Sequence, residues 1–140
     1  QHMQDVRVEA RRYGAVRDMF GRIRLVPEVK SAHTRVVQAG ERQAGNMPAQ
    51  GGAQGIIKKA MADLTPIYKQ LQSEGVHCDP LIQIHDDLVW EVEERALPFV
   101  ALLFASVMES TVRLRVPIKV ETKVGENWAE LKKYVKEATK

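Results

Sequence analysis

The segment Leu81–Val92, with the sequence LIQIHDDLVWEV, carries the clearest structural signal in the chain. Apolar residues that favour β-strands fill both halves, and two adjacent acids, Asp86 and Asp87, stand between them where the chain must turn. We therefore predict a β-hairpin in the middle of a sheet, with two carboxylates at its tip. Carboxylates fixed on a rigid hairpin suit a hard divalent cation such as Mg²⁺. Alternatively, the two aspartates only form the turn, whose geometry Asp tolerates.

The composition is that of an ordinary globular protein. The chain has 140 residues, 44% of them hydrophobic and 28% charged, which suits one domain or part of one. The formal charge of +3 is compatible with a polyanion partner but does not indicate one. The single cysteine, Cys78, excludes a disulfide framework and a cysteine-based metal site. Because no apolar run approaches the ~20 residues of a membrane span and no signal peptide opens the chain, we expect an intracellular protein without a membrane partner.

The segments around the hairpin alternate between helical and strand patterns. Helices are predicted at Asp5–Phe20, Ser31–Asn46 (with Ser31 as N-cap), Ile56–Ser73, Glu94–Arg113 and Ala129–Ala138, and strands within Phe20–Pro27 and at Val116–Val124. The apolar stripe of the third helix has helical spacing and is assigned to the core. This order predicts an α+β fold, in which an antiparallel sheet, formed by the hairpin and the C-terminal strand, packs against amphipathic helices.

The stretch Met47–Gly55 is predicted to be a loop between two helices. Pro48 is expected to end the preceding helix, and Gly51 and Gly52 allow backbone conformations that other residues avoid. A glycine-rich loop before a helix can approach a phosphate closely. However, the stretch matches neither GxGxxG nor GxxxxGK[ST], so it contains no nucleotide-binding fingerprint.

Basic and amide side chains recur on one side of two predicted elements. Strand alternation places Arg22 and Arg24 on one face, where they either grip phosphates or are solvated. Arg35, Gln38 and Arg42 recur at spacings of three and four, so they line one face of a helix. Arginines and amides on one face suit hydrogen bonds to nucleic-acid edges and phosphates, and the alternative is a solvated helix face.

Four segments, in collinear order across Arg11 to Tyr134, resemble the C-terminal part of the palm subdomain of family A DNA polymerases, the bacterial polymerase I type. YGAVRDMFGRIRLVPEV (residues 13–29) resembles the family pattern GYVxTLxGRRRxxPE. ERQAGNMPAQGGAQGIIKKAM (residues 41–61) resembles ERxAxNxPxQGTAADIxKxAM. LIQIHDDLVWEV resembles LxQVHDELxxEV, and VPIKVETKVGENWAE (residues 116–130) resembles the closing pattern VPLxVxxxxGxxW.

The resemblance implies a role for each matching residue. Asp86 matches the palm aspartate that coordinates two catalytic Mg²⁺ ions, for which Mn²⁺ is a possible substitute, and Asp87 stands where the family has glutamate. The implied activity is template-directed DNA synthesis by two-metal nucleotidyl transfer, with primer–template DNA and dNTP as partners. The expected DNA-binding residues are His85, Gln50, Asn46, Arg42, Arg35, Arg22 and Arg24. Donors of this kind suit the minor groove, whose acceptors are nearly the same for every base pair.

The 140 residues depart from the family at several points. Asp87 is one methylene shorter than glutamate, and Gly52 replaces the usual threonine. The sequence contains no DYSQIELR-like motif with the other metal-binding aspartate, and nothing that resembles the fingers helix or the thumb. We therefore expect an incomplete palm that needs a complementary polymerase segment and does not polymerise DNA alone. The alternative is a non-catalytic DNA-binding or structural module derived from a palm.

Overall fold

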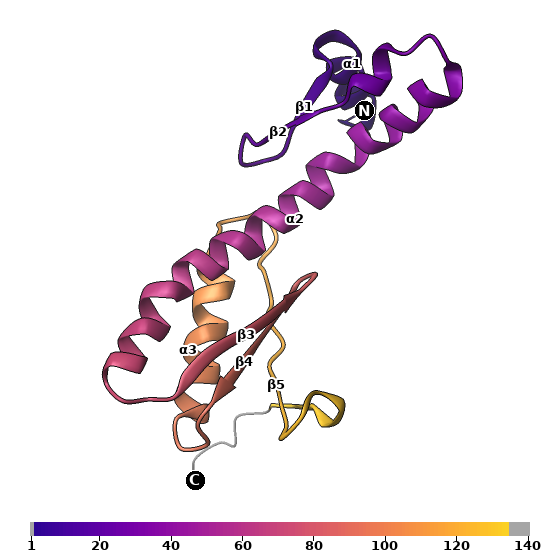
Figure 1. The fold of residues 1–140 in the computed structure, drawn as a ribbon. Helices are drawn as coiled ribbons and strands as arrows, with labels where there is room; N and C mark the ends of the chain where they lie inside the picture. Colours follow the sequence, from indigo (N-terminus) through magenta and orange to yellow (C-terminus); the bar gives the residue numbers. More distant parts are fainter. Residues whose placement is uncertain (1, 135–140) are drawn as a thin grey trace. The chain divides into compact units, whose positions relative to one another are not determined.

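The computed structural model describes residues 2–134 and divides into two compact units, Gln1–Gly55 and Ile56–Lys140 (Figure 1). The elements are α1 (His2–Tyr13), β1 (Ala15–Arg17), β2 (Ile23–Leu25), the 3₁₀ turn η1 (Pro27–Lys30), α2 (Thr34–Ser73), β3 (Cys78–Ile84), β4 (Asp87–Val92), α3 (Leu97–Ser110), β5 (Lys123–Val124), the 3₁₀ turn η2 (Trp128–Glu130) and β6 (Lys132–Lys133). The predicted α+β class is confirmed. Among the described residues, no helix is both long and apolar enough to cross a membrane.

The first helix ends earlier in the chain than its sequence suggests. Helix α1 ends at Tyr13 and strand β1 begins at Ala15, so the prediction of one helix over Asp5–Phe20 is wrong. The reason is Gly14, whose φ of 67° lies in the left-handed region and whose N–H donates to the Ala10 carbonyl at 2.7 Å. The core of this unit consists of Val6, Ala10, Val16, Val26, Val29 and Ala44.

Helix α2 passes without interruption through the stretch that was predicted to be a loop. It begins at Thr34, three residues after the expected N-cap, and continues past Pro48 and the glycines to Ser73. The prediction of two helices with a loop over Met47–Gly55 is therefore wrong. A proline in a helix interior costs about 3 kcal/mol, but α2 is packed before and after Pro48. Ala44 is buried in the core of the first unit, and Gly51 and Gly55 lie against Asp18 and Phe20.

The glycines of α2 allow close packing rather than a turn. A Cβ at Gly51 would lie 3.3 Å from the Asp18 Cβ, and a Cβ at Gly55 would overlap the ring of Phe20. A Cβ at Gly40 would lie 2.9 Å from the Glu28 Cβ. The segments that follow α1 therefore approach the backbone of α2 more closely than any larger residue would permit.

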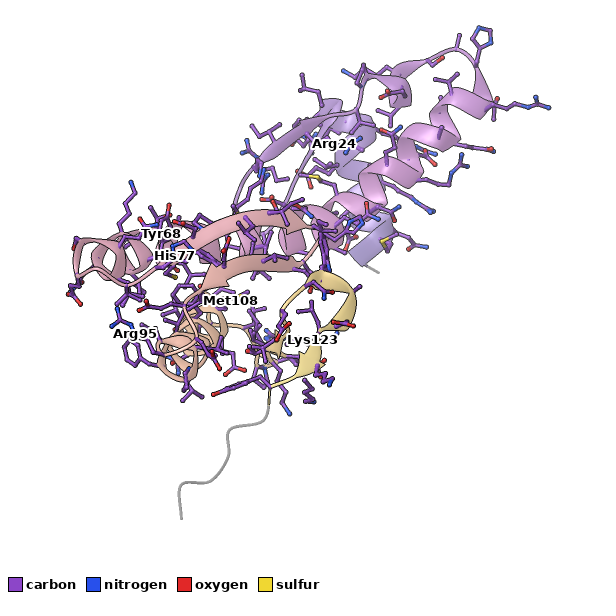
Figure 2. The ribbon with its side chains drawn as sticks, turned by 60° about the horizontal axis from the view of Figure 1, so that its bottom comes forward. Arg24, Tyr68, His77, Arg95, Met108 and Lys123 are labelled. Carbon is purple, nitrogen blue, oxygen red and sulfur yellow. The ribbon has the colours of Figure 1, made fainter. Side chains whose placement is uncertain are left out.

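The second unit has its own core, built on α2, α3 and the β3–β4 hairpin. Trp90 packs between Tyr68 and Phe104, with ring centroids 5.1 Å and 4.8 Å away and the rings tilted or edge to face. Leu64 is fully buried in this cluster. Met108, labelled in Figure 2, packs against the same cluster. This core confirms the apolar stripe predicted for Ile56–Ser73, which is now part of α2. It also fixes the β3–β4 hairpin through strand β4.

The ends of α2 and α3 follow local sequence signals. After α2, Gly75 has φ of 83° and Val76 N–H donates to the Leu71 carbonyl at 2.9 Å, which confirms Gly75 as the predicted stop. Pro98 lies in the first turn of α3, as predicted. Helix α3 is shorter at both ends than the predicted Glu94–Arg113.

The C-terminal strand does not join the hairpin. In the described part of the chain, β3 pairs with β4, β1 with β2, and β5 with β6, all antiparallel, so the predicted combined sheet is wrong. Strand β5 has two residues, and the apolar alternation from Val116 does not form a half-buried strand, since Val116 is 73% exposed. Residues 128–134 contain η2 and β6 instead of a predicted helix, whose last residues, 135–138, lie outside the described residues.

One carboxylate joins α2 to the end of α3. Asp63 accepts hydrogen bonds from Lys59 Nζ at 2.9 Å and 2.8 Å, and Thr111 Oγ1 lies 3.1 Å from its Oδ2. The hydrogen bond from Lys59 lowers the pKa of Asp63 most; desolvation opposes it, and Thr111 and the charge of Lys59 lower it further. Asp63 therefore stabilises the fold in its ionised form.

We expect Gly40→Ala and Gly52→Ala to change stability in opposite directions. Both replace a helical glycine, which alone favours folding by up to about 1 kcal/mol. At position 40 the new Cβ meets the Glu28 Cβ at 2.9 Å and the Val29 backbone nitrogen at 3.1 Å, which cannot move easily, so we expect a net loss of about 1–3 kcal/mol. At position 52 the new Cβ meets the Met19 Sδ at 3.2 Å. Because this flexible side chain can shift, we expect a net gain in stability of up to about 1 kcal/mol. Urea denaturation measures both, and equal effects would contradict the packing role.

Asp63 gives a prediction for acid unfolding. Its pKa is lowered in the folded state, so its stabilisation is complete above the unfolded value of about 3.9 and is lost as the pH falls through the folded value. The difference in free energy of unfolding between wild type and Asp63→Asn should therefore be constant near neutral pH and shrink below pH ~4. In a Lys59→Met background this pH dependence should be weaker. A difference that is the same at pH 3 and pH 6 would show that Asp63 has no such role.

Candidate functional site

The two predicted metal-binding residues lie at the tip of the β3–β4 hairpin. Ile84 pairs with Asp87, so the two turn residues are His85 and Asp86, and Asp87 is the first residue of β4. His85 has φ of 52° and is the one non-glycine residue with positive φ within residues 2–134. Gln83 Nε2, near the end of β3, donates to the His85 carbonyl at 2.8 Å. The predicted hairpin is confirmed. The two acids occupy different positions in it, since Asp86 is a turn residue and Asp87 is the first residue of β4.

The base of this hairpin is anchored while its tip is exposed. Leu88, Trp90 and Val92 pack against the core of the second unit. Because side chains alternate along a strand, Asp87 lies on the face opposite to Leu88. Asp86, Asp87 and His85 are all exposed. The acids are therefore held by a buried strand but remain accessible to a ligand in solution.

The tip offers two carboxylates and no more. Within residues 2–134, no group of three or more His, Cys, Asp or Glu side chains is arranged to hold a metal ion. Mg²⁺ is commonly bound by one or two protein carboxylates, with water and substrate phosphates completing its octahedral shell. Asp86 and Asp87 fit Mg²⁺ in this sense, as a partial site that needs oxygen ligands from elsewhere.

The predicted DNA-binding residues of α2 lie along one face, because the helix is continuous. At roughly 100° per residue, Arg35, Arg42, Asn46 and Gln50 fall within an arc of about 80°. All four side chains are exposed. A loop at Met47–Gly55 would have separated Gln50 from the other three residues. Because α2 is continuous there, Gln50 lies on the same face as they do. We call Arg35, Arg42, Asn46 and Gln50 the polar face of α2.

The β1–β2 hairpin places the two predicted strand arginines differently. Strand β2 begins at Ile23, so Arg22 lies in the turn before it, where Arg22 Nε is 3.3 Å from Asp18 Oδ2. Arg24 lies opposite Val16 in the strand pair and donates from Nη2 to Gln43 Oε1 of α2 at 3.0 Å (Figure 2). The structure thus brings Arg24 to α2, whereas Arg22 is paired within its own turn.

Sequence reasoning missed Asp18 and Gln43. The Asp18 side chain is fully buried, and its Oδ1 accepts the backbone N–H groups of Phe20 and Arg22, both at 2.9 Å. The signal was present, since Asp followed three residues later by Gly21 is typical of a tight turn. No local signal pointed to Gln43, because its partner Arg24 is 19 residues away.

The polar residues of the first unit sit in a basic segment. Residues 1–55 hold nine Lys and Arg and five Asp and Glu. Residues 1–130 match the sequence pattern described as DNA polymerase family A. The chain belongs to this family.

Named relatives agree with the family assignment. The chain is 41% identical over 124 residues to the thermostable DNA polymerase I of Thermus aquaticus, which covers 89% of this chain and 14% of that protein. It is 37% identical over 132 residues to DNA polymerase I of Geobacillus stearothermophilus, covering 94% of this chain and 15% of the relative. The chain thus spans about one seventh of the length of these family A polymerases.

A solved family A structure shares the fold. The POL domain of Pol1 from M. smegmatis, in complex with DNA primer-template and dNTP, matches with a TM-score of 0.74 and 34% identity. The match covers 84% of this chain and 20% of that one. The likeness supports DNA synthesis as the general activity of the family to which this chain belongs.

We expect the turn residue His85 to accept glycine but not valine. A non-glycine residue with φ of 52° carries backbone strain, and a β-branched side chain increases it. His85→Gly should therefore leave the free energy of unfolding unchanged or raise it by up to about 1 kcal/mol, whereas His85→Val should lower it by about 1–2 kcal/mol. The exposed His77→Val serves as control and should stay within about 0.5 kcal/mol. Equal losses for both His85 variants would refute the left-handed turn.

Proposed function

We propose that this chain is the C-terminal part of the palm of a family A DNA polymerase and that it takes part in template-directed DNA synthesis by two-metal nucleotidyl transfer. The observation that carries the proposal is the pair of exposed carboxylates, Asp86 and Asp87, at the tip of a core-anchored hairpin in a family A chain. The related POL domain, solved with primer-template DNA and dNTP, supports these two partners.

Asp86 and Asp87 would hold the catalytic Mg²⁺, or Mn²⁺ in its place. The chemistry that the ions supply when bound is neutralisation of phosphate charge and activation of the attacking 3′-hydroxyl. The protein's task at this tip is to keep two oxygen ligands fixed and accessible, which the anchored strand β4 achieves. Since two carboxylates form only a partial site, we infer that a complementary polymerase segment, in the same longer chain or in a second one, supplies the remaining ligands.

Primer–template DNA would be bound by the polar face of α2, Arg24, Arg22 and His85. Amide and guanidinium donors suit the acceptors of the minor groove, which are almost independent of sequence. A polymerase must accept every correct base pair, so this indifference to sequence is what its duplex contacts require. Because its DNA and dNTP partners are found inside cells, we also infer an intracellular location.

The acid pair gives the decisive test. We expect Mg²⁺-dependent primer extension when the chain is combined with a family A segment that carries a DYSQIELR-like motif. Asp86→Ala should reduce extension by more than about 100-fold, beyond the loss that follows removal of an outer-shell partner. The matched control is Glu91→Gln, which removes an exposed carboxylate from the other end of β4 and should leave extension unchanged.

Two results would count against the proposal. If Asp86→Ala extended primers as well as wild type, the metal assignment would be wrong. If the combination bound duplex equally well with and without Mg²⁺ and never extended it, the chain would be a non-catalytic DNA-binding module. The partial acid set of the described residues is the observation that favours this second candidate.

A further inference from the structure

The arginines of the first unit differ in the chemistry of their acceptors. Arg11 is paired with the carboxylate of Glu41, and Arg22 with the buried carboxylate of Asp18. Arg24 is held instead by a neutral amide, since its Nη2 donates to Gln43 Oε1 at 3.0 Å. A carboxylate orients a guanidinium but also neutralises its charge, whereas an amide oxygen orients it and leaves the charge intact.

The position of Arg24 is set by the packing of the β1–β2 hairpin. Arg24 is the cross-strand partner of Val16, so the two side chains share a face of this small sheet. Val16 is 1% exposed and packs in the same core as Ala44 of α2. Gln43 is the neighbour of Ala44 on the helix, and both Gln43 and Arg24 are themselves exposed. The buried pair below them therefore places amide and guanidinium within reach of each other at the surface.

We infer that Gln43 is a positioning residue for DNA binding: it orients the Arg24 guanidinium toward a phosphate of the primer–template. The inference rests on the proposed function. An arginine side chain loses rotamer entropy when it is fixed, and a preformed hydrogen bond lowers the part that is lost on binding. The guanidinium has five N–H donors, so one bond to Gln43 leaves the others for phosphate oxygens. In the family pattern ERxAxN, position 43 is a variable one, so the resemblance does not assign this role.

The test is a double-mutant cycle on binding of a short primer–template duplex by the full chain, followed by fluorescence anisotropy at several salt concentrations. Arg24→Ala should weaken binding and reduce the salt slope by about one phosphate contact. Gln43→Leu, which keeps a good helix former but removes the acceptor, should weaken binding about threefold to tenfold. In the Arg24→Ala background, Gln43→Leu should have no further effect. Urea denaturation of each variant checks that stability is unchanged.

Gln43→Glu distinguishes positioning from a structural contact. The new carboxylate should bind Arg24 more strongly and neutralise it, so DNA affinity and salt slope should fall toward those of Arg24→Ala although the contact is retained. The same change in the Arg24→Ala background measures direct repulsion of the DNA alone. As a matched control, Arg17→Ala removes an exposed arginine from the other face of the β1–β2 pair, where it donates to the Gly21 carbonyl at 3.2 Å.

Each failure has a distinct signature. If Arg24→Ala left affinity and salt slope at their wild-type values, or changed them no more than Arg17→Ala, the proposed DNA contact of Arg24 would be wrong. If Arg24→Ala weakened binding but Gln43→Leu did not, the positioning role would be overturned while the proposed function stood. Equal losses from Gln43→Leu with and without Arg24 would also overturn it, because Gln43 would then act by itself.

Discussion

Both hydrophobic cores of this chain are built on one uninterrupted helix. Helix α2 contributes Ala44 to the core of the first unit, and Leu64 and Leu71 to the core of the second. Its backbone ladder has to pass Pro48, which has no N–H and costs about 3 kcal/mol in a helix interior. Packing against the helix on both sides of this position offsets the cost, and the glycines make that packing possible because their backbone admits neighbouring side chains where a Cβ would clash.

The acidic tip depends on the opposite arrangement, a buried base and an exposed end. Trp90 is enclosed by Tyr68 and Phe104, so strand β4 is fixed close to the point where Asp87 begins it. Two neighbouring carboxylates repel each other and are poorly tolerated inside a core, but at an exposed hairpin tip water solvates them. An exposed pair of acids is thus consistent with the physics of the hairpin that carries it.

The basic first unit shows that the number of arginines is a poor guide to the charge available for a phosphate. Arg11 and Arg22 each have a carboxylate partner, whereas Arg24 has an amide. The exposed residues of the polar face of α2 combine guanidinium and amide donors, which suits backbone phosphates and the uniform acceptors of the minor groove. A family A polymerase needs such contacts along its duplex, since they depend on the geometry of a base pair and not on its identity.

Local signals in the sequence were sufficient for the hairpin at Leu81–Val92, the helix stop at Gly75, the helix start at Pro98, and the motifs that resemble family A polymerases, because strand patterning, turn chemistry and helix termini depend on residues close in the chain. The continuity of α2 was not predictable in this way. Proline and glycine normally indicate a break, and only the packing of Phe20 against Gly55 shows that these glycines serve close approach. The same holds for the separate β5–β6 pair and for the acceptor of each arginine. The α+β class, the acidic turn and the family follow from the sequence alone. That Gln50 continues the polar face of α2 and that Arg24 is paired with an amide instead of a carboxylate follow only from the tertiary structure, since both depend on contacts between residues far apart in the chain.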